Sequence, residues 1–478
     1  MRILLTALIN FLLIVSMVPS VAAQDTPPNV EGNWLTTLEV SGLKLRLVLK
    51  IEKSENKYTA KMDSVDQGTN DLPIDTVVLD GNKLSFTAAK LGVSYEGTLQ
   101  EGGNEISGTF KQGPLTAPMV FKRIAAAPKL ERPQDPKKPY PYDEEEVSYR
   151  NEKDNVKIAG TLTLPRGGNK YPAVLLITGS GSQDRNETVA GHRPFLVLAD
   201  HLTRNGIAVL RVDDRGVGGT ELGSPSITGE NFAEDVLAGV SFLKQRKEID
   251  PKIIGLIGHS EGGMIAPMVA ARSKDVSFIV LLAGLGQSGE DVIYSQTELI
   301  HKTQGTHPDT IAHTISLSKK INAIVKAETD PKRIEQRIND DIAAYAATLS
   351  EPQKKFFEPA VASVKAYMPM YKMPWYRYFI TFDPLPVLKN VKVPVLALNG
   401  ELDVQVPFKQ NLDLIGAGLK AGGNEDVTIK AFPKLNHLFQ TSKTGLISEY
   451  GVIEETMSPE VLKVISDWIL SKMTQKDR

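Results

Sequence analysis

Six short apolar runs, spaced along the chain from residue 146 onward, constrain its fold more than any other feature. They are rich in Val, Ile and Leu, and they lie at 172–178, 207–212, 253–258, 278–282, 393–399 and 427–432. Segments with helical periodicity follow most of them, at 195–204, 232–247, 262–272, 408–420 and 461–473. Continuous apolar runs are typical of strands buried on both faces, and strands that alternate with helices form parallel sheets. The sequence therefore predicts an α/β fold with a doubly wound, mostly parallel sheet.

Residues 288–390 interrupt this alternation. The segment has helical spacing and contains no convincing strand, although it lies between two of the apolar runs. We expect it to form a helical cap over the carboxyl ends of the strands, where open α/β sheets bind their ligands. The core should then consist of 146–287 and 391–478. The aromatic residues at 374–379 are expected either in the core or in the wall of a pocket.

The segment that precedes the sheet has a different periodicity. Apolar residues alternate with mostly polar ones at 43–50, and Gly-rich turn signals recur, as at 80–82 and 101–104. Short alternating strands with regular turns predict a small antiparallel β barrel or sandwich over 24–125. Five prolines interleaved with charged residues then predict a semi-rigid linker at 126–145.

The first residues have the pattern of a secretory signal. Arg2 precedes an almost wholly apolar run, and small residues end it at Ala23. This pattern predicts removal of 1–23, a mature chain that begins at Gln24, and a secreted or periplasmic protein. The run is shorter than the ~20 residues that a bilayer span needs. No other stretch is as apolar, so we expect no membrane span in the mature chain.

Composition excludes several kinds of function. The chain contains no Cys, which removes disulfides, thiolate metal sites and a Cys nucleophile. Its net charge of −2 provides no basic field for nucleic acid. We therefore expect neither a metal site nor a nucleic-acid partner, and the sequence leaves the oligomeric state open.

The strongest chemical signal is the segment Gly258-His259-Ser260-Glu261-Gly262-Gly263. It satisfies the pattern Gly-x-Ser-x-Gly, with an apolar run before it and a helical segment after it. A serine at such a strand-to-helix turn adopts a strained backbone, and only small flanking residues let the neighbouring chain pass. The turn exposes the hydroxyl above the sheet, so Ser260 is the candidate nucleophile.

A serine hydroxyl needs a base, and the chain offers seven histidines. His259 lies inside the turn, and five others precede the nucleophile or lie in the predicted cap. Only His437 follows the last predicted strand, where the order nucleophile, acid, base places it. We therefore predict His437 as the base.

The acid should follow the strand before the last one. Glu401 and Asp403 both lie there and both could orient an imidazole. Asp403 is the better candidate, because the turn at Gly400 carries the chain past Glu401 before the side chain must point inward. The predicted catalytic triad is therefore Ser260, Asp403 and His437.

The oxyanion of an acyl-transfer reaction needs two N–H donors. The amide of Glu261 supplies one. The small residues at 178–183 follow the first apolar run, and we expect Ser180 or Gly181 to supply the second. Asp213-Asp214-Arg215 ends the next strand and is expected to brace the neighbouring loop rather than to shape the entrance of the site.

Four motifs in this order resemble those of the α/β-hydrolase superfamily, and more narrowly those of bacterial exported esterases or hydrolases. They are 179–185, 214–218, 258–262 and 436–439. The resemblance covers about 146–475. It implies carboxylesterase activity on small acyl esters, no cofactor, and a triad at the three positions named above. At the front of the chain, Gly32-Asn33-Trp34 resembles the opening of lipocalin-like barrels.

Two other functions stay open at this point. A triad does not distinguish esters from amides, so a peptidase or amidase on the same scaffold is the first alternative. A ligand-binding protein with a silent hydrolase domain is the second, with the β-rich domain as the binding part.

Overall fold

The computed structural model describes residues 29–474, except 41, 42, 56, 68, 114, 129, 130 and 169. The predicted signal peptide at 1–23 lies outside the described residues. The chain divides into two compact units, one built around an N-terminal sheet and the other around the sheet that follows Ala127. Each unit is described by itself.

The N-terminal unit is an antiparallel sheet of nine strands in the order β4-β3-β2-β1-β9-β8-β7-β6-β5. The strands are β1 (Gly32–Val40), β2 (Leu43–Ser54), β3 (Lys57–Ser64), β4 (Thr69–Pro73), β5 (Thr76–Asp80), β6 (Lys83–Ala88), β7 (Val93–Leu99), β8 (Glu105–Gln112) and β9 (Leu115–Ile124). Pairing of β1 with β9 brings the two halves of this up-and-down meander together as a half-barrel. Buried aromatic side chains fill it, among them Trp34, Phe86, Tyr95, Phe110 and Phe121. The predicted antiparallel β domain is confirmed.

The second sheet has eight strands in the order β10-β11-β13-β12-β14-β15-β16-β17. The strands are β10 (Asp143–Asn151), β11 (Val156–Leu164), β12 (Tyr171–Ile177), β13 (Ala208–Val212), β14 (Ile249–His259), β15 (Phe278–Leu282), β16 (Val395–Gly400) and β17 (Val427–Phe432). From β13 to β17 all neighbours are parallel, and β11 runs antiparallel to both β10 and β13. This order is that of the α/β-hydrolase fold, which confirms the predicted fold class.

The first hairpin of this sheet, β10 and β11, did not follow from the apolar runs. β10 begins at Asp143, inside the range expected for the linker. Its first four residues are acidic and exposed, and only Val147 and Asn151 of the strand are buried. It is an edge strand, so it needs no continuous apolar run, and exposed charges are typical of such edges.

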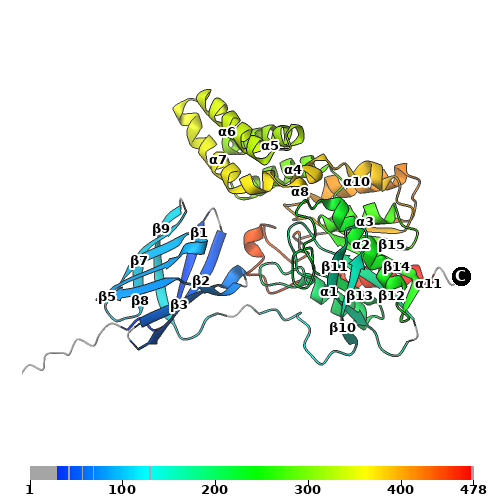
Figure 1. Cartoon of the computed structure of the whole chain (residues 1–478), viewed down its shortest axis with the longest axis horizontal. Coiled ribbons are helices and arrows are strands. Elements are labelled where there is room, and N and C mark those ends of the chain that lie inside the picture. Colours follow the sequence, from blue (N-terminus) through cyan, green and yellow to red (C-terminus); the bar gives the residue numbers. More distant parts are fainter. Residues whose placement is uncertain are drawn as a thin grey trace, which may run out of the picture. The chain divides into compact units, whose positions relative to one another are not determined.

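Helices cover both faces of the second sheet (Figure 1). α1 (Pro194–Arg204) and α11 (Pro459–Thr474) pack on one face, where they contact Val174 and Leu176 of β12. α2 (Gly229–Lys244), α3 (Gly262–Ala270) and α10 (Phe408–Ala421) pack on the other, with Leu175 between them. Successive side chains of one strand thus pack into the cores on opposite faces of the sheet. This is why the strands appear in the sequence as unbroken apolar runs.

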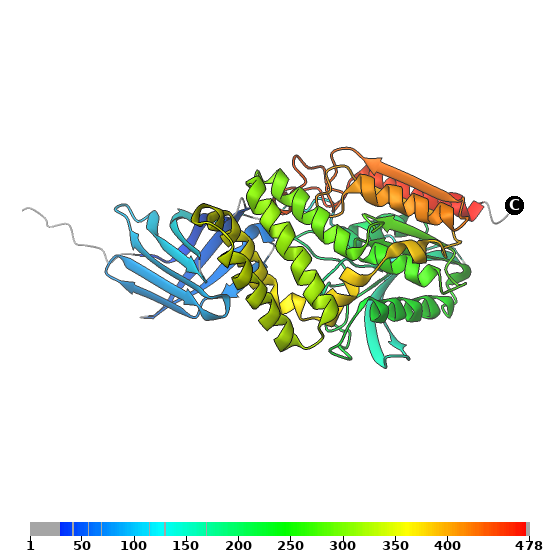
Figure 2. The same ribbon diagram turned by 90° about the horizontal axis from the view of Figure 1, so that it is seen from above.

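The segment predicted as a cap is helical, as expected. It consists of α4 (Gly289–Thr303), α5 (Pro308–Ala327), α6 (Pro331–Ala347), α7 (Glu351–Tyr371), α8 (Pro374–Thr381) and α9 (Pro384–Leu388). Four of these helices begin with proline, whose fixed φ suits the first helical position. Figure 2 shows the long helices of this segment packed against one another.

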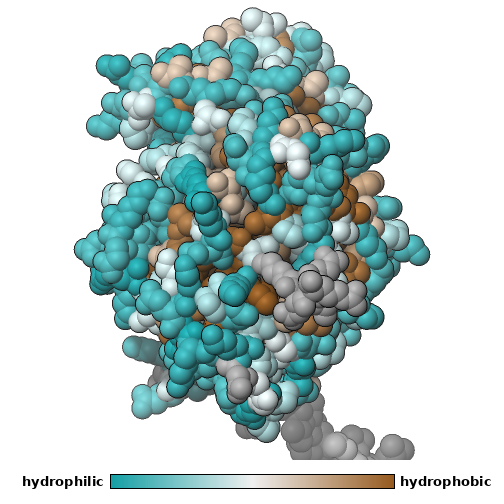
Figure 3. Space-filling view, turned by 90° about the vertical axis from the view of Figure 1, so that its right-hand side faces the viewer, coloured by the Kyte–Doolittle hydropathy of each residue, from teal (hydrophilic) through white to brown (hydrophobic). Residues whose placement is uncertain are grey.

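The face turned to the viewer in Figure 3 is mainly hydrophilic, and apolar side chains show mostly in the recesses between polar ones. Among residues 29–474, no helix combines the length and apolar character needed to cross a bilayer.

Candidate active site

Ser260 lies at the sharp turn between β14 and α3. Its φ of 54° is left-handed, a conformation that is strained for any residue except glycine. A Cβ on Gly258 would lie 2.0 Å from the carbonyl oxygen of Gly262, and one on Gly262 would lie 2.2 Å from that of Ile177. Only glycine fits at these two flanking positions. The turn therefore has the strained, tightly packed geometry that the motif predicts for a nucleophile.

His437 and Asp403 form a buried hydrogen-bonded pair. Nδ1 of His437 lies 2.7 Å from Oδ2 of Asp403. The other carboxylate oxygen of Asp403 accepts the backbone N–H groups of Gln405 and Val406, each at 2.8 Å. These bonds hold the carboxylate toward the imidazole. Glu401, the alternative acid, is exposed to solvent.

The pair lies beside the nucleophile turn. His259, the residue directly before Ser260, has its ring centroid 4.7 Å from that of His437 and its Nε2 3.0 Å from the His437 carbonyl oxygen. In this structure the Ser260 hydroxyl makes no hydrogen bond to a described residue. Such bonds commonly tighten only when substrate is bound. The fold thus brings the three predicted triad residues to one edge of the sheet.

The loop after β12 lies over the nucleophile. A Cβ on Gly179 would lie 3.3 Å from Cβ of Ser260. Its own amide donates to Glu187 at 2.7 Å, and the amide of Gln183 donates to Asp214 at 2.9 Å. The amides of 180–182, which include the predicted donors Ser180 and Gly181, have no hydrogen-bond acceptor among the described residues. These amides, and that of Glu261, are therefore available to an oxyanion.

The charged residues that end β13 brace their surroundings, and Asp213 and Asp214 also line the cavity described below. Asp213 binds Arg185 at 2.7 Å, and Arg215 binds Asp235 at 2.6 Å. Because of the Arg185 guanidinium, the pKa of Asp213 is lowered in spite of burial. Asp214 accepts the Thr178 hydroxyl at 2.8 Å and so fixes the start of the loop over Ser260.

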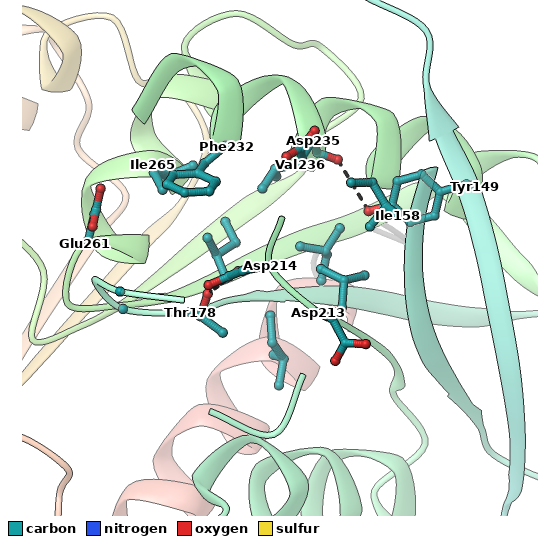
Figure 4. Close-up of a pocket in the computed structure, with 16 residues that line it drawn as sticks. Tyr149, Ile158, Thr178, Asp213, Asp214, Phe232, Asp235, Val236, Glu261 and Ile265 are labelled. Carbon is teal, nitrogen blue, oxygen red and sulfur yellow. Dashed lines mark hydrogen bonds between the residues drawn. The ribbon is translucent and has the colours of Figure 1, made fainter. Parts of the chain in front are cut away.

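A cavity of about 40 Å³ opens next to the nucleophile turn (Figure 4). Its walls are mostly apolar, with Phe232 and Ile265 on one side and the strand ends on the other. Glu261 and Asp214 also line it. Burial raises the pKa of each of these carboxyls to about 7. The cavity can hold a small uncharged group beside the candidate oxyanion amides.

One cap aromatic reaches the nucleophile turn. The indole Nε1 of Trp375, on α8, donates to Oε1 of Glu261 at 2.7 Å. Trp375 also stacks on Phe379, with ring centroids 5.6 Å apart. No residue of 374–379 lines the cavity of Figure 4, so this cluster serves mainly as packing between cap and core.

We expect Trp375→Phe to lower the free energy of unfolding of the unit built around the second sheet by about 1–2 kcal/mol, because the buried Glu261 carboxyl loses its hydrogen-bond donor. Urea titration of the variant and the wild type measures this difference. Tyr367→Phe, which removes a hydroxyl from an exposed aromatic on α7, is the control and should leave the midpoint unchanged. Equal midpoints for all three proteins would show that the contact is not stabilising.

Within the described part of the chain, no group of three or more His, Asp or Glu side chains is arranged to hold a metal ion.

Parts of the chain are similar in sequence to known proteins. Residues 193–352 match the family model described as serine aminopeptidase, S33, a range that includes Ser260 and ends before Asp403. The chain is 27% identical to Esterase EstD of Thermotoga maritima over 348 residues, which is 72% of this chain and 71% of that protein. It is 34% identical over 149 residues to Thiohydrolase aneE of Aspergillus aculeatus, covering 30% of this chain and 44% of that one.

Two solved structures contain similar chains. One is an esterase of Pyrococcus furiosus, with 17% identity, a TM-score of 0.39, and coverage of 69% of this chain and 91% of that one. The other is Est1E of Butyrivibrio proteoclasticus with ferulic acid bound, with 14% identity, a TM-score of 0.39, and coverage of 69% and 99%. The sheet order and the left-handed Ser260 turn are those of the α/β-hydrolase fold.

Sequence reasoning missed Glu187. This residue lies in the loop between β12 and α1, has a left-handed φ of 53°, and accepts hydrogen bonds from both Gly179 and His259. It lies just outside the motif at 179–185, and only the tertiary fold brings it to His259.

Proposed function

We propose that the protein is a serine carboxylesterase that cleaves small acyl esters through an acyl-enzyme on Ser260. The observation that carries this proposal is the 2.7 Å bond between His437 and Asp403 beside the strained serine turn. An imidazole held in this way by a buried carboxylate presents its other nitrogen as a base.

The proposed reaction is acyl transfer to water. Nε2 of His437 accepts the Ser260 proton while the serine oxygen attacks the ester carbonyl carbon. The N–H of Glu261 and an amide of the loop at 180–182 stabilise the negative oxygen that forms. The C–O bond to the alcohol then breaks, and His437 returns the proton to the leaving alkoxide. Water repeats these steps on the acyl-enzyme and releases the acid.

The small cavity supports short acyl groups. Its volume of about 40 Å³ is a few times the space that one water molecule requires. An acyl chain of a few carbons would bury its methylene groups against Phe232 and Ile265, at roughly 0.8 kcal/mol per group.

The match to the serine aminopeptidase model keeps amide hydrolysis as a second candidate. A panel of p-nitrophenyl acyl esters compared with aminoacyl p-nitroanilides separates the two. We expect turnover of the short-chain esters and little or none of the anilides. Strong anilide cleavage without ester turnover would reject the esterase proposal. A chain that cleaved neither and was not labelled by a fluorophosphonate would favour the ligand-binding alternative.

We also propose that the chain is exported after removal of 1–23. Expressed from its first Met in a Gram-negative host, the chain should be recovered from the periplasmic or medium fraction, with Gln24 as its first residue by N-terminal sequencing. Recovery of the full-length chain in the cytoplasmic fraction would contradict export.

A further inference from the structure

A buried pair of side chains, Glu187 and His259, joins the three loops that surround Ser260. Nδ1 of His259 lies 2.8 Å from Oε1 of Glu187, and the two side chains are 8% and 4% exposed. The same Oε1 accepts the amide of Gly179 at 2.7 Å. On the other side of the ring, Nε2 of His259 lies 3.0 Å from the His437 carbonyl oxygen. One chain of hydrogen bonds therefore links the oxyanion loop, the nucleophile turn and the loop of the proposed base.

The partners of His259 determine its protonation. A carbonyl oxygen only accepts, so Nε2 must carry a hydrogen. An ionised Glu187 carboxylate also only accepts, and its Oε1 faces both the Gly179 amide and Nδ1, so beside the ionised carboxylate Nδ1 carries a hydrogen as well. An imidazole with hydrogens on both nitrogens is a cation. Its charge is balanced by the Glu187 carboxylate, so the pair adds no net charge beside His437.

A second buried histidine provides a contrast inside the same unit. Nε2 of His192 faces the Tyr450 carbonyl oxygen at 2.8 Å, and its Nδ1 faces the Thr456 hydroxyl at 2.9 Å. A hydroxyl can donate, so His192 satisfies both bonds as a neutral ring. Burial, together with the nearby Arg132, lowers the pKa of His192 to about 4.

The electrostatics around His259 agree with a charged ring. Burial by itself disfavours the cation, but the Glu187 carboxylate, the His437 carbonyl and the Asp403 carboxylate together raise the pKa of His259. The titratable side chains that act on the ring are thus Glu187, Asp403 and its neighbour His437.

We propose that Glu187 and His259 form a permanent ion pair. The pair acts as two positioning residues, which hold the oxyanion loop and the loop of His437 in place relative to Ser260. The effect on catalysis rests on the proposed esterase function, whereas the ion pair does not. Because Glu187 engages the amide of Gly179, it directs the next amides of the loop toward the nucleophile. Because His259 binds the His437 backbone, it fixes where that ring enters the site.

The ion pair can be observed without any substrate. The full chain is labelled with ¹⁵N-histidine, and ring nitrogen signals are recorded by NMR between pH 6 and pH 9, with His259→Gln and His192→Gln used for assignment. We expect both His259 nitrogens to stay protonated over this range, and His192 to show one unprotonated nitrogen. A His259 ring with an unprotonated nitrogen at neutral pH would overturn the ion pair.

The positioning role is tested by Glu187→Gln, which keeps the size of the side chain and an oxygen for Gly179 but removes the charge. We expect His259 to lose one ring proton and kcat for a p-nitrophenyl acyl ester to fall about 10- to 100-fold, because a small displacement of reacting groups has an effect of this size. KM should change less than about threefold, since neither residue lines the cavity of Figure 4. Glu298→Gln, which removes a partly exposed carboxylate on α4, is the control and should change neither constant.

The outcomes separate this inference from the proposed function. A protonated His259 in a chain that hydrolyses no ester would contradict the esterase proposal and leave the ion pair intact. A neutral His259 in an active esterase would contradict the ion pair and leave the esterase proposal intact. If Glu187→Gln alters the ring proton but leaves kcat unchanged, the positioning role is wrong. If Glu187→Gln does not fold, the wild-type ring signals still decide the ion pair, and Glu187→Asp provides the kinetic comparison.

Discussion

Ser260→Ala is expected to lower kcat for a short p-nitrophenyl acyl ester by at least roughly 10⁴-fold, with little change in KM. The substitution removes the only oxygen that forms the acyl-enzyme bond, while the amides of the oxyanion loop and the cavity still bind substrate. Initial-rate assays over a range of ester concentrations give both constants. The substitution should also break no hydrogen bond, because the Ser260 hydroxyl has no hydrogen-bond partner among the described residues.

Ser226→Ala is the matched control for this substitution. Ser226 is exposed in the loop before α2, so its variant makes the same chemical change away from the site. It should retain wild-type kcat and KM. Retained activity in Ser260→Ala, well above that of a mock purification, would mean that another group is the nucleophile.

Asp403→Asn is expected to lower kcat by roughly 10³- to 10⁴-fold while leaving the chain folded. One carboxylate oxygen of Asp403 accepts two backbone N–H groups, so the amide oxygen of the variant must take that position. The amide NH₂ then faces Nδ1 of His437 and offers a hydrogen where the imidazole should donate one. His437 must therefore adopt the tautomer with hydrogen on Nε2, which cannot accept the serine proton.

Glu401→Gln makes the equivalent change two positions earlier in the same loop. Glu401 is exposed, and the structure pairs Asp403, not Glu401, with His437. The control should keep wild-type activity within a factor of two or three. If Glu401→Gln caused the large loss and Asp403→Asn did not, the assignment of the acid would be reversed. Ring nitrogen NMR of His437 in both variants reports the tautomer directly.

The features that sequence predicted well are those fixed by short-range constraints. Gly258 and Gly262 are required by contacts of about 2 Å with neighbouring backbone, so the nucleophile turn leaves a local signature. Asp403 and His437 are far from Ser260 in sequence, but Asp403 follows the buried strand β16 and His437 follows the parallel edge strand β17. Since the carboxyl ends of parallel strands meet at one edge, the order of strands was enough to bring these residues together.

The features that sequence did not predict depend on tertiary packing. Glu187 lies two residues beyond the motif at 179–185, and its partner His259 comes from a distant segment. The bond from Trp375 to Glu261 likewise depends on how α8 of the cap packs on the nucleophile turn. The hairpin of β10 and β11 was missed because an exposed edge strand has no continuous apolar run.

His259 illustrates the limit most clearly. From the sequence it was excluded as the base because it precedes Ser260 inside the turn, and the structure agrees that it faces Glu187 instead of the serine hydroxyl. Exclusion from one role gave no indication of another. Only its two hydrogen-bond partners, one on each side of the ring, point to the charged state proposed above.

The most direct test of this account is to locate the covalent adduct that a fluorophosphonate forms with the full chain. Intact mass measurement followed by peptide mapping should show a single phosphonyl group on Ser260 in the wild type and none in Ser260→Ala. Asp403→Asn should be labelled far more slowly than Glu401→Gln. An adduct on a different residue, or equal labelling of wild type and Ser260→Ala, would contradict a nucleophilic serine at this turn.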